Sequence, residues 1–143
     1  MKSIKYGYPE NRQMLVAAEP EALYATTPKL QIYQIKSFIH LNDLLPFSQA
    51  EWADILHISD RTLQRYLKDE KPFEGLHAEH LHQLENMASL AKQVIGKPDA
   101  VKSWLLQKKE VLGTILDFSS LRSFWGVKRI SNELGRIAHG VYI

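Results

Sequence analysis

The chain has 143 residues, of which 45% are hydrophobic and 24% are charged, and it contains no cysteine. This composition is ordinary for a soluble globular protein of one compact unit or two small ones that share a core, and it excludes disulfides and thiolate sites. Because the N-terminal residues lack the apolar stretch of a signal peptide and no run approaches the ~20 apolar residues of a membrane span, we expect a cytoplasmic protein without a membrane partner.

The formal net charge is +2, but the charges are unevenly distributed. Residues 1–95 contain ten Lys and Arg against twelve Asp and Glu, which gives −2, whereas residues 96–143 contain eight against four, which gives +4. Affinity for nucleic acid comes largely from neutralised phosphates, so a DNA-binding motif in the first part would bind weakly alone. We therefore expect a homodimer, or a hetero-oligomer with a partner protein, to supply the rest.

The N-terminal third of the chain has no single clear pattern. Residues 1–28 are interrupted by glycine and proline, so we expect an irregular arm with a short helix at residues 19–24. Residues 30–32 alternate like a strand, whereas the apolar residues that follow are spaced like a helix face. We favour a supporting helix over residues 36–45, which Pro46 ends.

Two short helices joined by a tight turn are predicted over residues 46–68. Ser48 and Glu51 have the spacing of a capping box at the start of the first helix. Phe47 and Trp52 are placed to close over this cap as a hydrophobic staple. These local patterns fix where the first helix begins.

The turn between the two helices has the spacing of a helix-turn-helix. Ser59 is placed to cap the second helix. The small residue Ala53 lets the helices cross closely, and Ile58 and Leu63 fill the angle between them. His57 stands where the motif usually has glycine, and we expect it to adopt the left-handed backbone conformation.

The second helix carries residue types that reach DNA phosphates and base edges. The predicted DNA-binding residues are Gln49, Ser59, Arg61, Thr62, Gln64, Arg65 and Lys68. The alternative is an ordinary helical pair used only for packing, and the acidic residues Glu51 and Asp54 on the first helix favour it slightly.

Helical patterns continue to the end of the chain. After a polar loop at residues 69–75, a long helix is predicted over residues 77–95, and Pro98 opens the next one. The helix over residues 77–95 has an apolar stripe that consists of Leu81, Leu84, Ala88, Ala91 and Ile95. Residues 108–120 are predicted to form a bend. The last helix begins at Gly126 and ends before Gly140, which fits the left-handed position after a helix.

Patterns for catalysis and metal binding are weak. A Gly-rich phosphate loop, a nucleophile elbow and paired carboxylates are all missing from the sequence, which predicts a protein that is not an enzyme and has no cofactor. His77, His80 and His82 are close together, but no third ligand accompanies a pair on one helix face, so we predict no metal site. Trp104 is read as a half-buried core residue rather than a partner anchor.

The C-terminal quarter contains a set of residues with a characteristic spacing, namely Trp104-Leu105, Leu112-Gly113, Gly126 and the closing residues Leu134-Gly135-Arg136-Ile137-Ala138-His139-Gly140-Val141-Tyr142. In these residues it resembles the toxin-binding domain of the Xre/MbcA/ParS antitoxin family. The helix-turn-helix resembles the Xre-like domain of the same family, so the resemblance covers about residues 36–143. The chain departs from the family pattern at Thr114 and Asp117, where the family usually has Gly and Pro.

This resemblance implies an antitoxin of a type II toxin–antitoxin pair. The usual partner is a RES-domain toxin, which consumes NAD and whose fold is related to ADP-ribosyltransferases. The antitoxin's C-terminal segment would cover the toxin's active-site cleft, and its helix-turn-helix would bind the operator DNA of its own operon.

The predicted toxin-binding residues are Val127, Ile130, Leu134, Arg136, Ile137, His139, Val141 and Tyr142. In this hypothesis the apolar members form one face of the last helix, and Arg136 and His139 reach into a cleft that normally takes an anionic dinucleotide. The alternative is that the apolar positions are the core of a small helical domain.

We therefore predict an all-α protein with three parts. They are an N-terminal arm at residues 1–28, an Xre-like helix-turn-helix domain at residues 29–95 and a toxin-binding domain at residues 96–143. Two other functions stay open: an interaction module whose helix-turn-helix serves only dimerisation and toxin capture, and a free-standing Xre-type transcription regulator.

Overall fold

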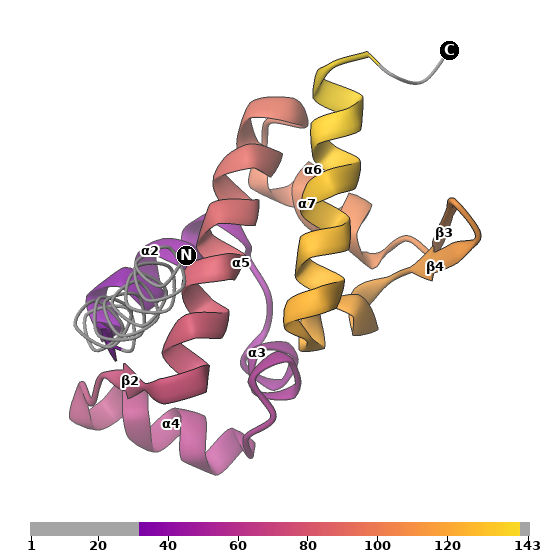
Figure 1. The fold of residues 1–143 in the computed structure, drawn as a ribbon. Helices are drawn as coiled ribbons and strands as arrows, with labels where there is room; N and C mark the ends of the chain where they lie inside the picture. Colours follow the sequence, from indigo (N-terminus) through magenta and orange to yellow (C-terminus); the bar gives the residue numbers. More distant parts are fainter. Residues whose placement is uncertain (1–31, 141–143) are drawn as a thin grey trace, which may run out of the picture.

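The computed structural model describes residues 32–140, in which helices make up most of the chain (Figure 1). The elements are β1 (Ile32–Tyr33), α2 (Ile35–Leu44), α3 (Gln49–Leu56), α4 (Asp60–Asp69), β2 (Phe73–Glu74), α5 (Gly75–Val94), α6 (Pro98–Leu106), β3 (Lys109–Val111), β4 (Thr114–Leu116), the 3-10 helix η1 (Phe118–Arg122) and α7 (Phe124–Ala138). The predicted all-α class is confirmed. The predicted arm, its short helix, Val141 and Tyr142 lie outside the described residues.

The long helix α5 lies at the centre of the fold, with α2 on one side and α7 on the other, while α3 and α4 lie near its N-terminal end (Figure 1). Its predicted apolar stripe is confirmed as core, because Leu81, Leu84, Ala88 and Ala91 are buried. These residues belong to one hydrophobic cluster that also includes the buried residues of α3 and α7. The helix-turn-helix and the C-terminal residues therefore share one core.

The start of the helix-turn-helix is built as its local sequence predicts. The Ser48 hydroxyl accepts from the Glu51 amide at 3.1 Å, and the Glu51 carboxylate accepts from the Ser48 amide at 2.7 Å, which completes the capping box. The rings of Phe47 and Trp52 meet edge to face, with centroids 5.3 Å apart. Both rings are buried, so the cap is joined directly to the core.

The turn between α3 and α4 has the predicted left-handed residue. His57 has φ 60° and ψ 40°, and the amide of the following Ile58 donates to the Ala53 carbonyl at 3.0 Å. Ser59 then caps α4 by accepting from the Thr62 amide. Leu63 is fully buried in the angle between the helices. The helix-turn-helix geometry follows from these contacts.

The sequence indicated only a loop at residues 69–75, but Phe73 and Glu74 form the two-residue strand β2. Here β1 and β2 pair antiparallel, and Tyr33 is the register partner of Phe73. The Tyr33 hydroxyl donates to Glu85 of α5 at 2.5 Å, which fixes β1 against the long helix. Of the residues with the strand pattern, 30–32, only Ile32 is described; it lies in β1, and its pairing partner Glu74 lies about forty residues along the chain.

The bend predicted at residues 108–120 is a β-hairpin followed by η1. Strands β3 and β4 pair antiparallel, with Val111 opposite Thr114. The two loop residues between them, Leu112 and Gly113, both have positive φ, at 53° and 80°. Two-residue hairpin turns of this kind match the twist of the strands but usually carry Asn-Gly, so Leu112 concealed the signal.

Helix α7 begins two residues before the predicted start at Gly126. The Ser123 hydroxyl accepts from the Gly126 amide at 2.9 Å and caps the helix. A Cβ atom at Gly126 would collide with the carbonyl oxygen of Ser120, so only glycine allows η1 to pack this closely on α7. Gly140 has φ 65° after the end of the helix, which confirms the predicted left-handed position.

Candidate nucleic-acid interface and C-terminal surface

The outer face of α4 carries a row of exposed polar side chains. Arg61, Gln64, Arg65 and Lys68 are all exposed, and their spacing of three, four and seven residues places them on one helix face. The opposite face is held on the core by the buried Leu63. Three cations and one amide are thus presented outward, as an interface with DNA phosphates and base edges requires.

The two glutamines of the predicted DNA-binding set contact each other. The Gln64 side chain on α4 donates to the side-chain oxygen of Gln49 at 3.3 Å. Gln49 is the first residue of α3, where the helix dipole favours a phosphate. This contact sets the orientation of Gln64 and places both side chains on the same side of the motif.

Ser59 and Thr62 have a structural role at the start of α4. The Ser59 hydroxyl accepts from the Thr62 amide at 3.0 Å and donates to the Thr62 hydroxyl at 2.9 Å. Both side chains therefore define where α4 begins. Their contact with DNA stays a prediction, whereas their capping role is a feature of the structure.

The acidic residues of α3 face the C-terminal part of the chain. Glu51 lies 3.4 Å from the Lys102 ammonium of α6, and Asp54 lies 3.5 Å from the Arg122 guanidinium of η1. Burial alone would raise the pKa of Glu51, but the Ser48 amide and the Lys102 charge outweigh it and hold that pKa below its ordinary value. These carboxylates are paired within the chain, so they do not argue against a DNA-binding role.

Two histidines connect the helix-turn-helix side of the fold to η1. The His57 ring donates through Nε2 to the Arg122 carbonyl at 2.6 Å, and the His80 ring donates to the Leu121 carbonyl at 2.8 Å. His80 is 4% exposed, and its burial lowers the pKa of the imidazole. Sequence reasoning missed this junction, because no local pattern indicates partners 65 and 41 residues apart.

Three predicted toxin-binding residues lie in the protein's own core. Val127, Ile130 and Leu134 are 2%, 0% and 0% exposed, and α7 packs them against α5 and η1. The expectation that they form an open apolar face is corrected, because that face is already covered by the same chain. The alternative reading of these positions as core describes the structure.

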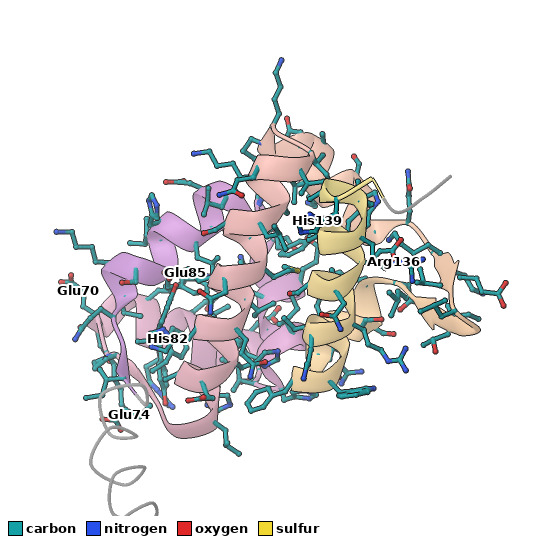
Figure 2. The ribbon with its side chains drawn as sticks, turned by 45° about the horizontal axis from the view of Figure 1, so that its top comes forward. Glu70, Glu74, His82, Glu85, Arg136 and His139 are labelled. Atoms are coloured by element: carbon teal, nitrogen blue, oxygen red, sulfur yellow. The ribbon has the colours of Figure 1, made fainter. Side chains whose placement is uncertain are left out.

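The remaining predicted toxin-binding residues lie at the C-terminal end of α7. Arg136 and Ile137 are half-buried and His139 is exposed. The Arg136 guanidinium lies 4.0 Å from the buried carboxylate of Glu133, and Figure 2 shows Arg136 and His139 on either side of this end of the helix. A partner could therefore contact the basic and apolar side chains at this end of α7 while the buried core residues stay in place.

The first turn of α7 carries a group that sequence reasoning missed. Trp125 is 63% exposed, and the Lys128 ammonium and the Arg129 guanidinium lie 5.9 and 5.4 Å from the centre of its ring. Arg129 also donates to the Thr114 hydroxyl on β4 at 3.0 Å, which ties the hairpin to α7. A signal existed, because Trp125 falls outside the apolar spacing of Val127, Ile130 and Leu134 on this helix.

Taken together, the fold and the outer face of α4 define a helix-turn-helix protein of the DNA-binding kind. Residues 34–79 match the family model described as the antitoxin Xre-like helix-turn-helix domain. Residues 34–79 therefore form a helix-turn-helix domain of the Xre-like antitoxin type, in agreement with the resemblance of this part of the chain. A search of the curated proteins found no match. None of the helices in the described part of the chain is long and apolar enough to cross a membrane.

Proposed function

We propose that this protein is an antitoxin that neutralises a cognate RES-domain toxin and represses its own operon. The observation that carries the proposal is the row of Arg61, Gln64, Arg65 and Lys68 on α4, within a domain of the antitoxin type. In this function the protein acts in the cytoplasm by binding, without catalysis or a cofactor.

For DNA binding, α4 enters the major groove of the operator. Arg61 and Arg65 are suited to guanine edges or phosphates, and Gln64 is suited to adenine. Three cations on one helix neutralise few phosphates, so a second copy of the motif adds the affinity that a single copy lacks. A homodimer, or an assembly with toxin, would read two half-sites about 34 Å apart.

For toxin binding, the C-terminal half contributes its net charge of +4, counted over residues 96–143. Arg136 and His139 are placed at the end of α7, beside the half-buried Ile137. A cationic group at this end suits a toxin surface that carries acidic side chains, because opposite charges favour the correct encounter and suppress wrong ones. Val141 and Tyr142 belong to the same proposed contact.

The test combines two measurements on the full-length chain. Co-expression with the toxin encoded beside its gene should restore growth and give a complex that co-purifies. A gel shift with the upstream DNA should show salt-dependent binding. Absence of a complex would refute the antitoxin role toward that toxin, and absence of a shift with and without toxin would refute autorepression. Removing α7 is not a clean test, because it would expose the core residues Ile130 and Leu134.

A further inference from the structure

Trp125 stands between two hollows on the surface of the C-terminal part. One hollow, of about 330 Å³, lies between α5 and α7 and is lined by Gln83, Asn86, Phe124 and Ser131. The other, of about 260 Å³, lies between the β3–β4 hairpin and α7 and is lined by Val111, Leu112, Leu116 and Asn132. Trp125 and Lys128 line both hollows. We call Leu112, Trp125, Lys128, Arg129 and the two hollows the Trp125 surface.

The two large apolar side chains of the Trp125 surface, Trp125 and Leu112, are mostly exposed to solvent. Trp125 is 63% exposed and Leu112 is 80% exposed, although Val127, two residues along the chain from Trp125, is buried. A tryptophan contributes a large apolar area, and residues of this type dominate the free energy of binding where they enter a pocket. We therefore expect an exposed tryptophan beside two hollows to be a hot-spot residue, because a partner that fills both hollows would bury the ring on two sides.

The Trp125 surface is also held in place before any partner arrives. Trp125 is in the first turn of α7, which the Ser123 cap and the tight packing of Gly126 on Ser120 both fix. The bond from Arg129 to Thr114 fixes the hairpin that carries Leu112. Less side-chain and loop freedom is lost on binding when a surface is ordered in advance.

The charges on this surface select the chemistry of the partner. Lys128 and Arg129 lie near the Trp125 ring, and Arg136 of α7 lines the hollow between the hairpin and α7. Among the residues that line the two hollows the one acidic residue is Glu133, and because it is buried, the exposed charged groups there are cationic. A partner with carboxylates around an apolar groove is therefore complementary to it.

We propose that the Trp125 surface is the main contact with the toxin, whose own surface supplies an apolar groove rimmed by Asp and Glu. This rests on the proposed antitoxin function and extends the contact from the C-terminal end of α7 to the outer face of its first turns and the hairpin. A second copy of this chain fits less well, because a two-fold contact at Trp125 would bring Lys128 and Arg129 against their own copies. Operator DNA is contacted elsewhere, since α4 and the hairpin lie at opposite ends of the molecule (Figure 1).

The experiment measures the affinity of the full-length chain for the purified toxin by calorimetry. Trp125→Ala should weaken binding by about 30-fold, as removal of a hot-spot residue does. Lys128→Glu should weaken it by about 10-fold, mainly through a slower association rate. The matched controls are Ile39→Ala, an exposed apolar residue of α2, and Lys92→Glu, an exposed cation of α5, which should change the affinity less than twofold.

Failure of this inference is distinguishable from failure of the proposed function. If the wild-type chain binds toxin and both variants bind within twofold of it, the Trp125 surface is not the contact although the antitoxin role stands. If the wild-type chain does not bind the toxin, the antitoxin role fails and the inference with it. Two further measurements on the same variants test the other occupants. If the variants lose self-association in sedimentation but bind toxin unchanged, the surface contacts a second copy of the chain and the inference is overturned. If they lose operator binding in gel shifts but bind toxin unchanged, the surface contacts DNA, which also overturns the inference.

Discussion

Helices α4 and α7 are both amphipathic and basic, but they use their two faces differently. In α4 the outer cations Arg61, Arg65 and Lys68 are exposed on a helix that only Leu63 fixes fully in the core. In α7 five residues are buried, and Arg129 is bonded to the hairpin. Helical spacing therefore shows which face is apolar, but it does not show whether the chain itself or a partner covers that face.

The largest expected effect is a loss of stability when the inner face of α7 is changed. Ile130→Ala should lower the free energy of unfolding by about 2–5 kcal/mol, because it leaves a cavity in a fully buried site. Urea denaturation monitored by circular dichroism measures this. The half-buried Ile137→Ala is the matched control and should cost less.

A small stability loss in Ile130→Ala together with a large loss of toxin affinity would contradict this account of α7. It would mean that the apolar face opens to the partner, as the sequence alone suggested. A large stability loss with toxin binding retained in the folded fraction would assign the face to the core.

The second effect concerns the outer face of α4. Arg61→Ala, Gln64→Ala and Arg65→Ala should each weaken specific operator binding by about 1–3 kcal/mol where the residue reads a base edge, because the partner groups on DNA are left unpaired. The measurement is a fluorescence titration with operator DNA at fixed salt. Unfolding free energies should change little, since these side chains are exposed.

Lys92→Ala is the control for this series, because Lys92 is an exposed cation in the last turn of α5, away from α4. If all three α4 variants bind the operator as tightly as Lys92→Ala does, α4 does not read the groove. The helix-turn-helix would then serve association only.

The two regions also differ in how far the sequence predicted them. The helix-turn-helix was predicted closely, because its signals are local: the Ser48–Glu51 capping box, the Ser59 cap and the left-handed His57 each act within a few residues. Such interactions are visible as short spacings, so the outward position of Gln64 and its neighbours followed from them.

The C-terminal region was predicted less well, because its geometry depends on distant pairs. The hairpin turn carries Leu112 at a position where Asn is usual, and η1 is held by His57 and His80 from far along the chain. Trp125 is exposed only because the hairpin and α5 leave hollows on both sides of it. The spacing within α7 indicates that Trp125 lies off the buried face of the helix, but it does not show the hollows beside it.

A third, smaller effect tests the junction between the two regions at His57. The left-handed conformation costs a non-glycine residue about 1–2 kcal/mol, whereas the bond to the Arg122 carbonyl returns about 0.5–1.5 kcal/mol. His57→Ala loses the bond and keeps the strain, so it should destabilise by about 1 kcal/mol. His57→Gly loses both and should be more stable than His57→Ala by about 1 kcal/mol in urea denaturation.

Ala50 in α3 is the control, because there glycine should be less stable than alanine. Ala50→Gly should lower the free energy of unfolding by about 1 kcal/mol, since the residue is helical. Equal stability of the two His57 variants would show that the turn carries no strain. A large loss in both would show that the contact with Arg122 outweighs the backbone term.

The smallest effect is a pH dependence at the same junction. Burial, the largest cause, lowers the pKa of His80 below its ordinary value of 6.5, and the nearby His57 and His77 add to this against the bond to the Leu121 carbonyl. Below pH 6.5 the unfolded chain therefore binds a proton more readily than the folded chain does, so stability should fall as the pH decreases from 6.5 toward the folded pKa.

His80→Gln keeps an amide donor for Leu121 and removes the titration, so its stability should fall less between pH 7.5 and pH 5.5 in urea denaturation. The control His40→Gln, at an exposed histidine of α2, should retain the wild-type slope. Identical slopes for wild type and His80→Gln would show that the histidine contact between α5 and η1 does not couple folding to protons.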